Sequence, residues 1–315
     1  RWLSREAANL LSVEYFHVVF TLPEEVADLA KSNAAVMYDR LFHAASRTLR
    51  EVAANPKRLG AQVGTLMVLH TWGQTLQHHP HVHAVVTGGG LSCDAKGVVD
   101  AVPTWKSCRP GFFLPVRVLS RVFRRLYLES LREAFAAGTL TVPGSLVEPS
   151  AFARWLAALE AKEWVVYAKP PFGGPEATLK YLARYTHRVA ISNSRIINID
   201  NQCVTYTYKD YKNDNQQKVM TLSGEEFLRR FVQHVLPKGF VKMRHYGLLA
   251  PRDRAERLAL ARRLLVVESV RSRLASPSEP ACAVAPPAEP CCPFCGSRRL
   301  VIRELPQEVA SADTS

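Results

Sequence analysis

Apolar residues recur along the chain with two spacings, one typical of β-strands and one typical of α-helices. Alternation is clearest at residues 15–22, where Phe16 and Phe20 share one face and Pro23 ends the strand. Similar patterns predict further strands at residues 65–74, 81–87, 164–168, 189–199, 204–211 and 218–222. A Gly-Gly-Gly run at residues 88–90 directly follows the predicted strand at 81–87 and is expected to end that strand.

Helical spacing of apolar residues fills the segments between these strands. Within residues 34–54, for example, Val36, Leu41, Leu49 and Val52 lie on one side of a helix. Helices are expected at residues 4–11, 24–32, 34–54, 119–137, 150–162, 225–236 and 253–270. The strands are joined by short turns, such as Asn-Asp-Asn at 213–215, so the chain mixes helices with hairpin-connected strands.

Charge separates a basic body from a tail of different composition. The sequence has 41 Lys and Arg against 28 Asp and Glu, and residues 1–273 hold 38 against 23, a net charge of +15. A body this basic typically binds a polyanion, most often nucleic acid, although a solvated basic surface explains the charge nearly as well. Residues 274–290 contain five prolines among Ala and Ser, as in a linker. We therefore expect a body over residues 1–250, a helix over 251–273 and a mostly disordered tail over 274–315.

The composition also bears on the cellular compartment. No apolar run approaches the roughly 18 residues that a membrane span needs, and no signal peptide opens the chain, so no membrane partner is expected. Seven cysteines, three of them single in the body (Cys93, Cys108, Cys203), fit a reducing cytoplasm better than a disulfide framework. Because the first residue is Arg1, we expect a fragment or a processed form.

Histidines are concentrated in one short stretch. Five of the ten lie between positions 70 and 83, and the last two, His81 and His83, are spaced H-x-H. Alternate residues of a strand point to one face, so both imidazoles would point the same way and could bind a divalent metal. A structural or surface pair is the commoner explanation of H-x-H alone. A zinc hydrolase of the H-x-H-x-D-H type is disfavoured, because this chain continues Ala-Val-Val where that motif requires an acid.

A third ligand follows from the hairpin that the two strands at 65–74 and 81–87 would form. With a loop over residues 75–80, Gln74 lies opposite His81 and projects from the same face as both histidines. Two imidazoles and one amide oxygen, with further positions open, would suit Mg²⁺ or Mn²⁺ and would also accept Zn²⁺. The other candidates for the third ligand are His17, His70, His79 and His187.

A second cluster of reactive side chains follows about a hundred residues later, in KYLARYTHRVAIS. Tyr181 and Tyr185 are four residues apart, so on a helix they would share a face and could address one site in turn. A phenol titrates near pH 10, so at pH 7 it needs a metal to polarise the phosphate it attacks. Phosphate also needs cationic partners, and the candidate DNA-binding residues are Lys180, Arg184, His187 and Arg188. Without these neighbours, a half-buried amphipathic helix would be the better explanation.

Three segments in order, YFHVVFTLP, HPHVHAVVTGGG and YLARYTHRVAIS, resemble the two-tyrosine HUH rolling-circle transposases of the insertion sequence 91 family, over most of residues 10–250. The resemblance implies an α+β fold, an antiparallel sheet flanked by helices, with His81 and His83 as metal ligands on a central strand. It implies that Tyr181 and Tyr185 are paired nucleophiles, each forming a 5′-phosphotyrosine with single-stranded DNA and releasing a 3′-hydroxyl. Members usually carry a Cys-rich zinc-binding region before the first strand; this sequence lacks it, so recognition of ends or target would be impaired.

The implied activity is metal-dependent nicking and strand transfer between element ends and a target, by a cytoplasmic, nucleoid-associated bacterial protein. The sequence contains no G-x-x-x-x-G-K-[ST] motif, so unwinding is expected to come from a host helicase or the replication machinery. One alternative is a plasmid or phage replication initiator or relaxase with the same chemistry. Another is a truncated, non-catalytic module that binds DNA through its charge.

Two further features lie outside these motifs. Cys292 and Cys295 form a single C-x-x-C pair, which is either half of a Zn²⁺ site, completed from elsewhere, or free thiols in a disordered tail. Tyr206 and Tyr208 would share one face of a strand, with Lys209, Tyr211 and Lys212 close behind. Such a strand is either a platform on which single-stranded bases stack or an ordinary half-buried hairpin.

Overall fold

The structure is a computed structural model that describes residues 2–172, 177, 190–211 and 213–275. Residues 1–268 group into one unit and residues 269–315 into a second. The tyrosine segment and the C-x-x-C pair lie outside the described residues, as do all of the following: Lys180, Tyr181, Arg184, Tyr185, His187, Arg188, Lys212, Cys292 and Cys295.

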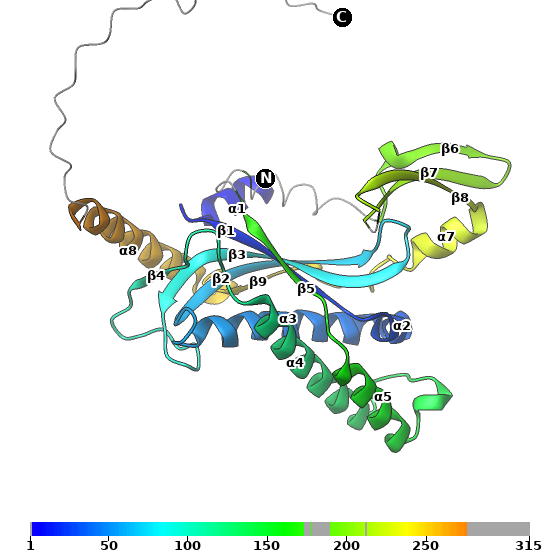
Figure 1. The fold of residues 1–315 in the computed structure, drawn as a ribbon, viewed down its shortest axis with the longest axis horizontal. Coiled ribbons are helices and arrows are strands. Elements are labelled where there is room, and N and C mark those ends of the chain that lie inside the picture. The colour runs from blue at the N-terminus through cyan, green and yellow to red at the C-terminus, as the bar shows by residue number, and fades with distance from the viewer. Residues whose placement is uncertain (1, 173–176, 178–189, 212, 276–315) are drawn as a thin grey trace, which may run out of the picture. The chain divides into compact units, whose positions relative to one another are not determined.

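The main sheet of the first unit is antiparallel throughout and follows the order β5-β1-β3-β2-β9, with β4 paired to β3 (Figure 1). Its strands are β1 (Tyr15–Thr21), β2 (Ala61–Trp72), β3 (His78–Ser92), β4 (Trp105–Ser107), β5 (Val166–Phe172) and β9 (Met243–Gly247). The strands β4 and β9 were not predicted, because each is short and shows little alternation of apolar and polar residues.

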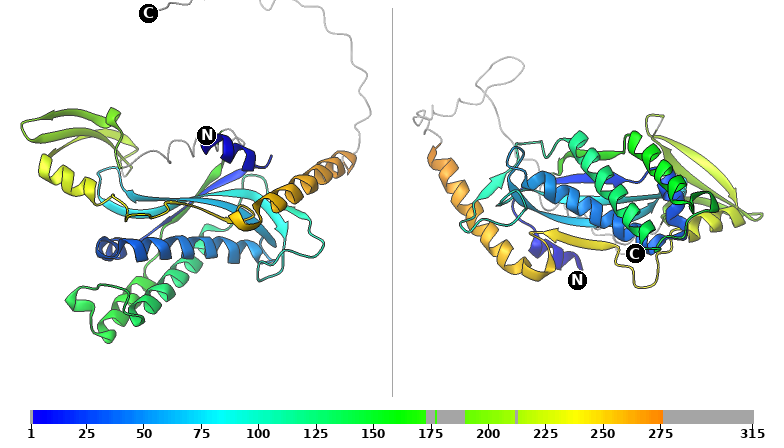
Figure 2. Two further views of the ribbon diagram at one scale, coloured as in Figure 1. Left: turned by 180° about the vertical axis from the view of Figure 1, so that it is seen from behind. Right: turned by 90° about the horizontal axis from the view of Figure 1, so that it is seen from below.

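Helices cover one face of this sheet. On this side lie α2 (Glu24–Ser32), α3 (Ala34–Ala54) and α4 (Val116–Ala136), with α5 (Pro149–Ala161) packed against α4, and the bounds predicted for the first two are confirmed. Figure 2 shows α3 and α4 running along the same side of the sheet. Every second residue of the central strands turns toward them, among them Val18, Phe20, Val82 and Ala84, all fully buried. This layer is the principal hydrophobic core.

The opposite face is covered only in part. At one end, α1 (Trp2–Asn9) and α8 (Arg254–Ala275) accompany a second apolar cluster that includes Leu66, Val85 and Leu258. Nearer the other end of β2 and β3, the same face carries polar residues in place of apolar ones. The side chains that alternate with the core residues there are those of His70, His81 and His83.

After residues 178–189, which lie outside the described ranges, the chain forms a smaller antiparallel sheet in the order β6-β7-β8. Its elements are β6 (Ile196–Asp200), β7 (Cys203–Asp210), β8 (Gln216–Ser223) and the helix α7 (Gly224–Val232). The predicted turn between β7 and β8 is confirmed, with Asp214 and Asn215 at positive φ. The sheet is tied to the β2–β3 loop, since Arg230 Nη1 and the Tyr206 hydroxyl both donate to the Thr75 carbonyl oxygen.

The expectation that the Gly-Gly-Gly run ends its strand was wrong, because β3 continues to Ser92. A Cβ on Gly90 would lie 2.2 Å from the Gln62 carbonyl oxygen, so glycine here permits close approach of β2 rather than termination. Elsewhere the expected α+β class, an antiparallel sheet flanked by helices, is confirmed. None of the helices in the described ranges has the length and apolar character needed to cross a membrane.

Candidate metal centre and adjoining groove

Three histidines converge on the uncovered face of the main sheet. His70 lies on β2 opposite His81 on β3, and His83 lies two residues further along β3. One nitrogen from each ring lies within 4.8 Å of the others. The rings of His70 and His83 have centroids 4.4 Å apart, and those of His81 and His83 4.8 Å apart. Three imidazole nitrogens this close together form a candidate donor set for one divalent ion.

The hairpin that carries this cluster has a different register from the one expected. The turn spans residues 73–77, Trp72 pairs with His78, and His81 lies opposite His70 rather than Gln74. A bulge between His70 and Trp72 and a positive φ at the buried Leu76 produce this tighter turn. The partner of His81 on β2 is thus four residues earlier than expected. Because four is an even number, the partner still projects from the same face as His81 and His83, and that partner is His70.

Gln74 lies in the turn, and its side chain is engaged elsewhere. Its amide nitrogen donates to the Tyr211 hydroxyl (3.0 Å), and its amide oxygen accepts from the backbone N–H of Lys209 (3.3 Å). The register from which Gln74 was inferred as a metal ligand was therefore wrong. Among the candidates named with it, the geometry favours His70.

Metal titration can distinguish His70 from Gln74 as the third ligand. His70→Ala is expected to raise the Mn²⁺ concentration for half-maximal binding at least tenfold, because one of three ligands is lost. Gln74→Ala should leave that concentration within about twofold of the unmodified chain. Isothermal titration of the two variants checks the expectation, with His79→Ala as a matched control on the same strand. A larger effect of Gln74→Ala than of His70→Ala would restore the original assignment.

Two hydrogen bonds orient the candidate ligands. His81 Nδ1 lies 2.7 Å from the carbonyl oxygen of His79, to which it can donate. His83 Nδ1 lies 2.8 Å from His17 Nε2, and the two rings are stacked with centroids 5.1 Å apart. Both contacts engage Nδ1, so Nε2 is the nitrogen through which His81 and His83 would bind a metal. The sequence marked His17 only as an alternative ligand; its position behind His83 depends on the pairing of β1 with β3.

Burial keeps these imidazoles neutral. It lowers the pKa of His81 to about 4, and the pKa of His17 to about 3 with a further contribution from Lys169. Burial is also the main cause that holds the pKa of His83 well below its usual range, and the neighbouring histidines lower it further. A neutral imidazole has the lone pair that a metal requires. His81 and His83 can therefore bind a metal at neutral pH without first releasing protons.

Neutral buried histidines also make stability depend on pH, and His78 provides the test. Burial is the main cause that lowers its pKa to about 4, and its ring contacts the Tyr38 hydroxyl and the Ala27 carbonyl. The unfolded chain takes up this proton near pH 6.5, so stability present above pH 6.5 is lost as the pH falls toward 4. We expect His78 alone to remove about 1–2 kcal/mol between pH 6.5 and 5. Urea unfolding in EDTA measures this, and His78→Gln should flatten the dependence; an equal slope in both proteins would contradict it.

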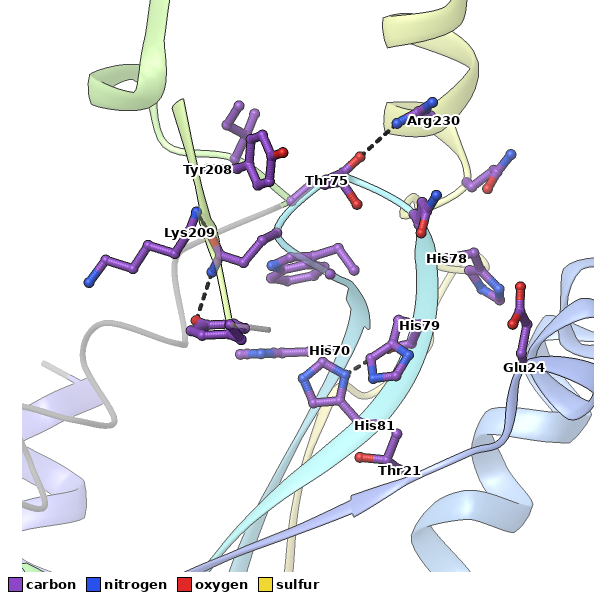
Figure 3. Close-up of a pocket in the computed structure, with 18 of the residues that line it drawn as sticks. Thr21, Glu24, His70, Thr75, His78, His79, His81, Tyr208, Lys209 and Arg230 are labelled. Atoms are coloured by element: carbon purple, nitrogen blue, oxygen red, sulfur yellow. Dashed lines mark hydrogen bonds between the residues drawn. The ribbon is translucent and has the colours of Figure 1, made fainter. Parts of the chain in front are cut away.

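A groove of about 1270 Å³ opens above the histidine cluster. The three histidines lie along it, and its other wall comes from the small sheet, through Tyr208, Lys209 and Tyr211. Figure 3 shows His70 and His81 on the strands of the main sheet, with Tyr208 and Lys209 on the strand of the small one. Among the described residues that line the groove, the cationic ones outnumber the acidic ones. The cationic residues are Lys31, Arg195, Lys209, Arg229 and Arg230, and the acidic residues are Glu24, Asp28 and Glu163.

The expected tyrosine platform on β7 is only partly present. Tyr206 is fully buried, where it packs against Phe227 of α7, so its ring is unavailable to a base. Tyr208 is half-buried at the groove, and Tyr211 is 66% exposed there. Arg195, which sequence analysis did not single out, lies over the Tyr206 ring and donates to the Gln74 carbonyl oxygen.

An antiparallel sheet with three clustered histidines on its uncovered face defines an α+β protein with a candidate divalent-metal centre. The chain belongs to the Y2_Tnp transposase family, whose model, described as "Putative transposase", matches residues 64–257. The family resemblance inferred from the sequence is thereby confirmed.

Two curated proteins show the same relationship. The chain is 54% identical over 268 residues to "Putative transposase y4qJ" of Sinorhizobium fredii, covering 84% of this chain and 66% of that protein. It is 31% identical over 259 residues to the transposase for insertion sequence element IS801 of Pseudomonas savastanoi pv. phaseolicola, covering 80% of this chain and 58% of that protein. The chain thus spans about three fifths to two thirds of the length of these relatives.

Among solved structures, the conjugative relaxase TrwC in complex with mutant oriT DNA is matched with a TM-score of 0.27 and 14% identity. The match covers 78% of this chain and 72% of that one. A similarity this low does not bear on the function of the chain.

Proposed function

We propose that this protein nicks and rejoins single-stranded DNA through 5′-phosphotyrosine intermediates, as a transposase of the rolling-circle type. The observation that carries the proposal is the cluster of His70, His81 and His83 on the open face of the sheet, within a transposase-family chain. The basic body and the cationic groove beside the cluster support a DNA substrate.

The donor set fits a divalent cation. Three imidazoles, of which His81 is oriented by the His79 carbonyl and His83 by His17, leave open positions for substrate oxygens. A set of nitrogen ligands binds Mn²⁺ more tightly than Mg²⁺, so we propose Mn²⁺ or Mg²⁺, with Mn²⁺ effective at lower concentration. When bound, such an ion would polarise the scissile phosphate and offset its developing charge.

The protein's own residues would then carry out two transesterifications. In the first, the phenolic oxygen of Tyr181 or Tyr185 attacks phosphorus, the bond from phosphorus to the 3′-oxygen breaks, and that oxygen leaves as a 3′-hydroxyl after taking up a proton. In the second, a 3′-hydroxyl attacks the phosphotyrosine and releases the tyrosine. One phosphoester bond is exchanged for another in each step, so rejoining needs no ATP. Strand separation before the first step is assigned to a host helicase or the replication machinery.

The test is a covalent adduct. A single-stranded oligonucleotide carrying a label on the 3′ side of the nick is incubated with the protein and Mn²⁺, then run on a denaturing gel. The proposal expects a slower labelled protein–DNA band that requires the cation and disappears on protease treatment. Binding of the oligonucleotide with no adduct under any divalent cation would leave only a DNA-binding module.

A further inference from the structure

The wall of the groove that faces the histidine cluster carries the features of a nucleotide-binding surface. We propose that Tyr211, Tyr208 and Lys209 bind the single-stranded DNA beside the metal centre, with a base stacked on Tyr211 and a phosphate held by Lys209. This inference rests on the proposed function, because it names where the strand would lie next to the same site. It extends that function by assigning a substrate-binding wall to the small sheet.

The first observation is the exposure of a large ring in a groove. Tyr211 is 66% exposed, directly after the end of β7, and Tyr208 is half-buried on the same strand. Both line one continuous groove with His81 and His83. Every base has a flat aromatic face, so exposed tyrosines along a cationic groove can stack bases of any sequence. Single-stranded DNA is favoured over duplex, since paired bases offer no free face.

The second observation is that the exposed ring is held in place. The amide of Gln74 bridges the Tyr211 hydroxyl and the Lys209 backbone, and the Gln74 carbonyl oxygen accepts from Arg195 Nη2 at 2.5 Å. Gln74 lies in the turn that joins the two histidine-bearing strands, so one hydrogen bond and a short stretch of backbone link the ring to His70. Gln74 is therefore a positioning residue for the wall. A ring ordered before binding loses less entropy when a base stacks on it.

The third observation is the charge of Lys209. The neighbouring cations that the structure describes have partners: Arg229 and Arg230 pair with Glu226, Lys218 pairs with Asp210, and Arg195 donates to two backbone carbonyl oxygens. Within the described part of the chain, Lys209 is exposed and forms no ion pair. Its ammonium group can therefore reach a phosphate without breaking an existing salt bridge.

The experiment measures binding of a labelled oligothymidylate by fluorescence anisotropy in EDTA, so neither metal nor cleavage contributes. Tyr211→Ala is expected to weaken binding by about 5- to 150-fold, the range for losing one base–aromatic stack. Tyr211→Phe keeps the ring and loses only its hydrogen bond to Gln74, so it should lose less than Tyr211→Ala and about as much as a variant without the Gln74 amide. Gln74→Ala should give an intermediate loss. Lys209→Ala should reduce the slope of log K against log salt by about 0.7, the value for one phosphate contact on a single strand.

Matched controls are an exposed aromatic and an exposed lysine outside the groove, Phe112→Ala and Lys57→Ala, which should leave oligonucleotide affinity and salt slope nearly unchanged. An oligonucleotide with one abasic position supplies the second measurement. If Tyr211 stacks on a base, abasic substitution at one position should remove the effect of Tyr211→Ala. The proposal is overturned if Tyr211→Ala binds like the unmodified chain, or if it weakens duplex binding as much as single-strand binding.

These outcomes are separate from those of the nicking assay. If the unmodified chain forms no adduct but Tyr211→Ala weakens single-strand binding, the proposed DNA-binding wall stands and the proposed nicking activity is wrong. If the unmodified chain forms the adduct and Tyr211→Ala binds single-stranded DNA normally, the proposed nicking activity stands and the proposed wall is wrong.

Discussion

Replacing His83 with alanine is expected to reduce DNA nicking about 10³-fold, while metal-free binding of single-stranded DNA stays within about twofold. A loss of this size corresponds to about 4 kcal/mol of transition-state stabilisation, the order of the contribution that a bound cation makes at a reacting phosphate. Binding survives because most of the phosphate affinity comes from the basic body rather than from the histidines. His81→Ala should behave in the same way, since its ring belongs to the same cluster.

The measurement compares initial nicking rates with anisotropy in EDTA for each variant. His43→Ala, an exposed histidine on the outer side of α3, is the matched control and should nick at the normal rate. Raising Mn²⁺ should partly rescue the ligand variants, because lost affinity can be offset by concentration. Parallel loss of nicking and of metal-free binding in both variants would mean that the histidines hold the fold or the DNA rather than a metal.

Much of the architecture could be predicted because local pattern and tertiary structure agree. The helices at 24–32 and 34–54 have the predicted bounds, since their apolar faces recur at helical spacing and pack on one side of the sheet. The alternation in β1 likewise matches a strand with one face in the core. For these elements the sequence within the segment determines the structure, and long-range contacts only reinforce it.

The third ligand could not be predicted because it depends on register between two strands. The H-x-H spacing places His81 and His83 on one face whatever strand pairs with them. Which residue of β2 joins them depends on where the turn falls, and that is decided by a bulge after His70 and by the conformation of Leu76. Neither feature has a clear local signature, since the turn lacks the Asn-Gly or Asp-Gly pair that would fix a tight hairpin.

The role of Gln74 shows how much such a register matters. Gln74 lies close to the histidine cluster in the sequence, but the turn directs its side chain toward the small sheet, where its amide donates to the Tyr211 hydroxyl. That contact joins residues 137 positions apart. Only the packing of the small sheet against the β2–β3 turn reveals it.

The second large effect is expected at the two proposed nucleophiles. Tyr181 and Tyr185 lie one helical turn apart in the sequence pattern, so each could reach the same phosphate. Phenylalanine keeps the ring and its packing and removes only the hydroxyl, so neither single change should disturb the fold. Tyr181→Phe and Tyr185→Phe are each expected to retain some covalent protein–DNA adduct, because one nucleophile remains in place.

In the proposed mechanism, complete strand transfer needs both hydroxyls, since one tyrosine holds the first cleaved end while the other opens the second strand. Each single variant should therefore lose joining of two strands by more than about 10²-fold, and the double variant should form no adduct at all. Tyr167→Phe, an exposed tyrosine on β5, provides the control and should retain both activities. An adduct that survives in the double variant would place the nucleophile elsewhere in the chain. Normal two-strand joining by either single variant would show that one tyrosine is sufficient, and the paired mechanism would then be wrong.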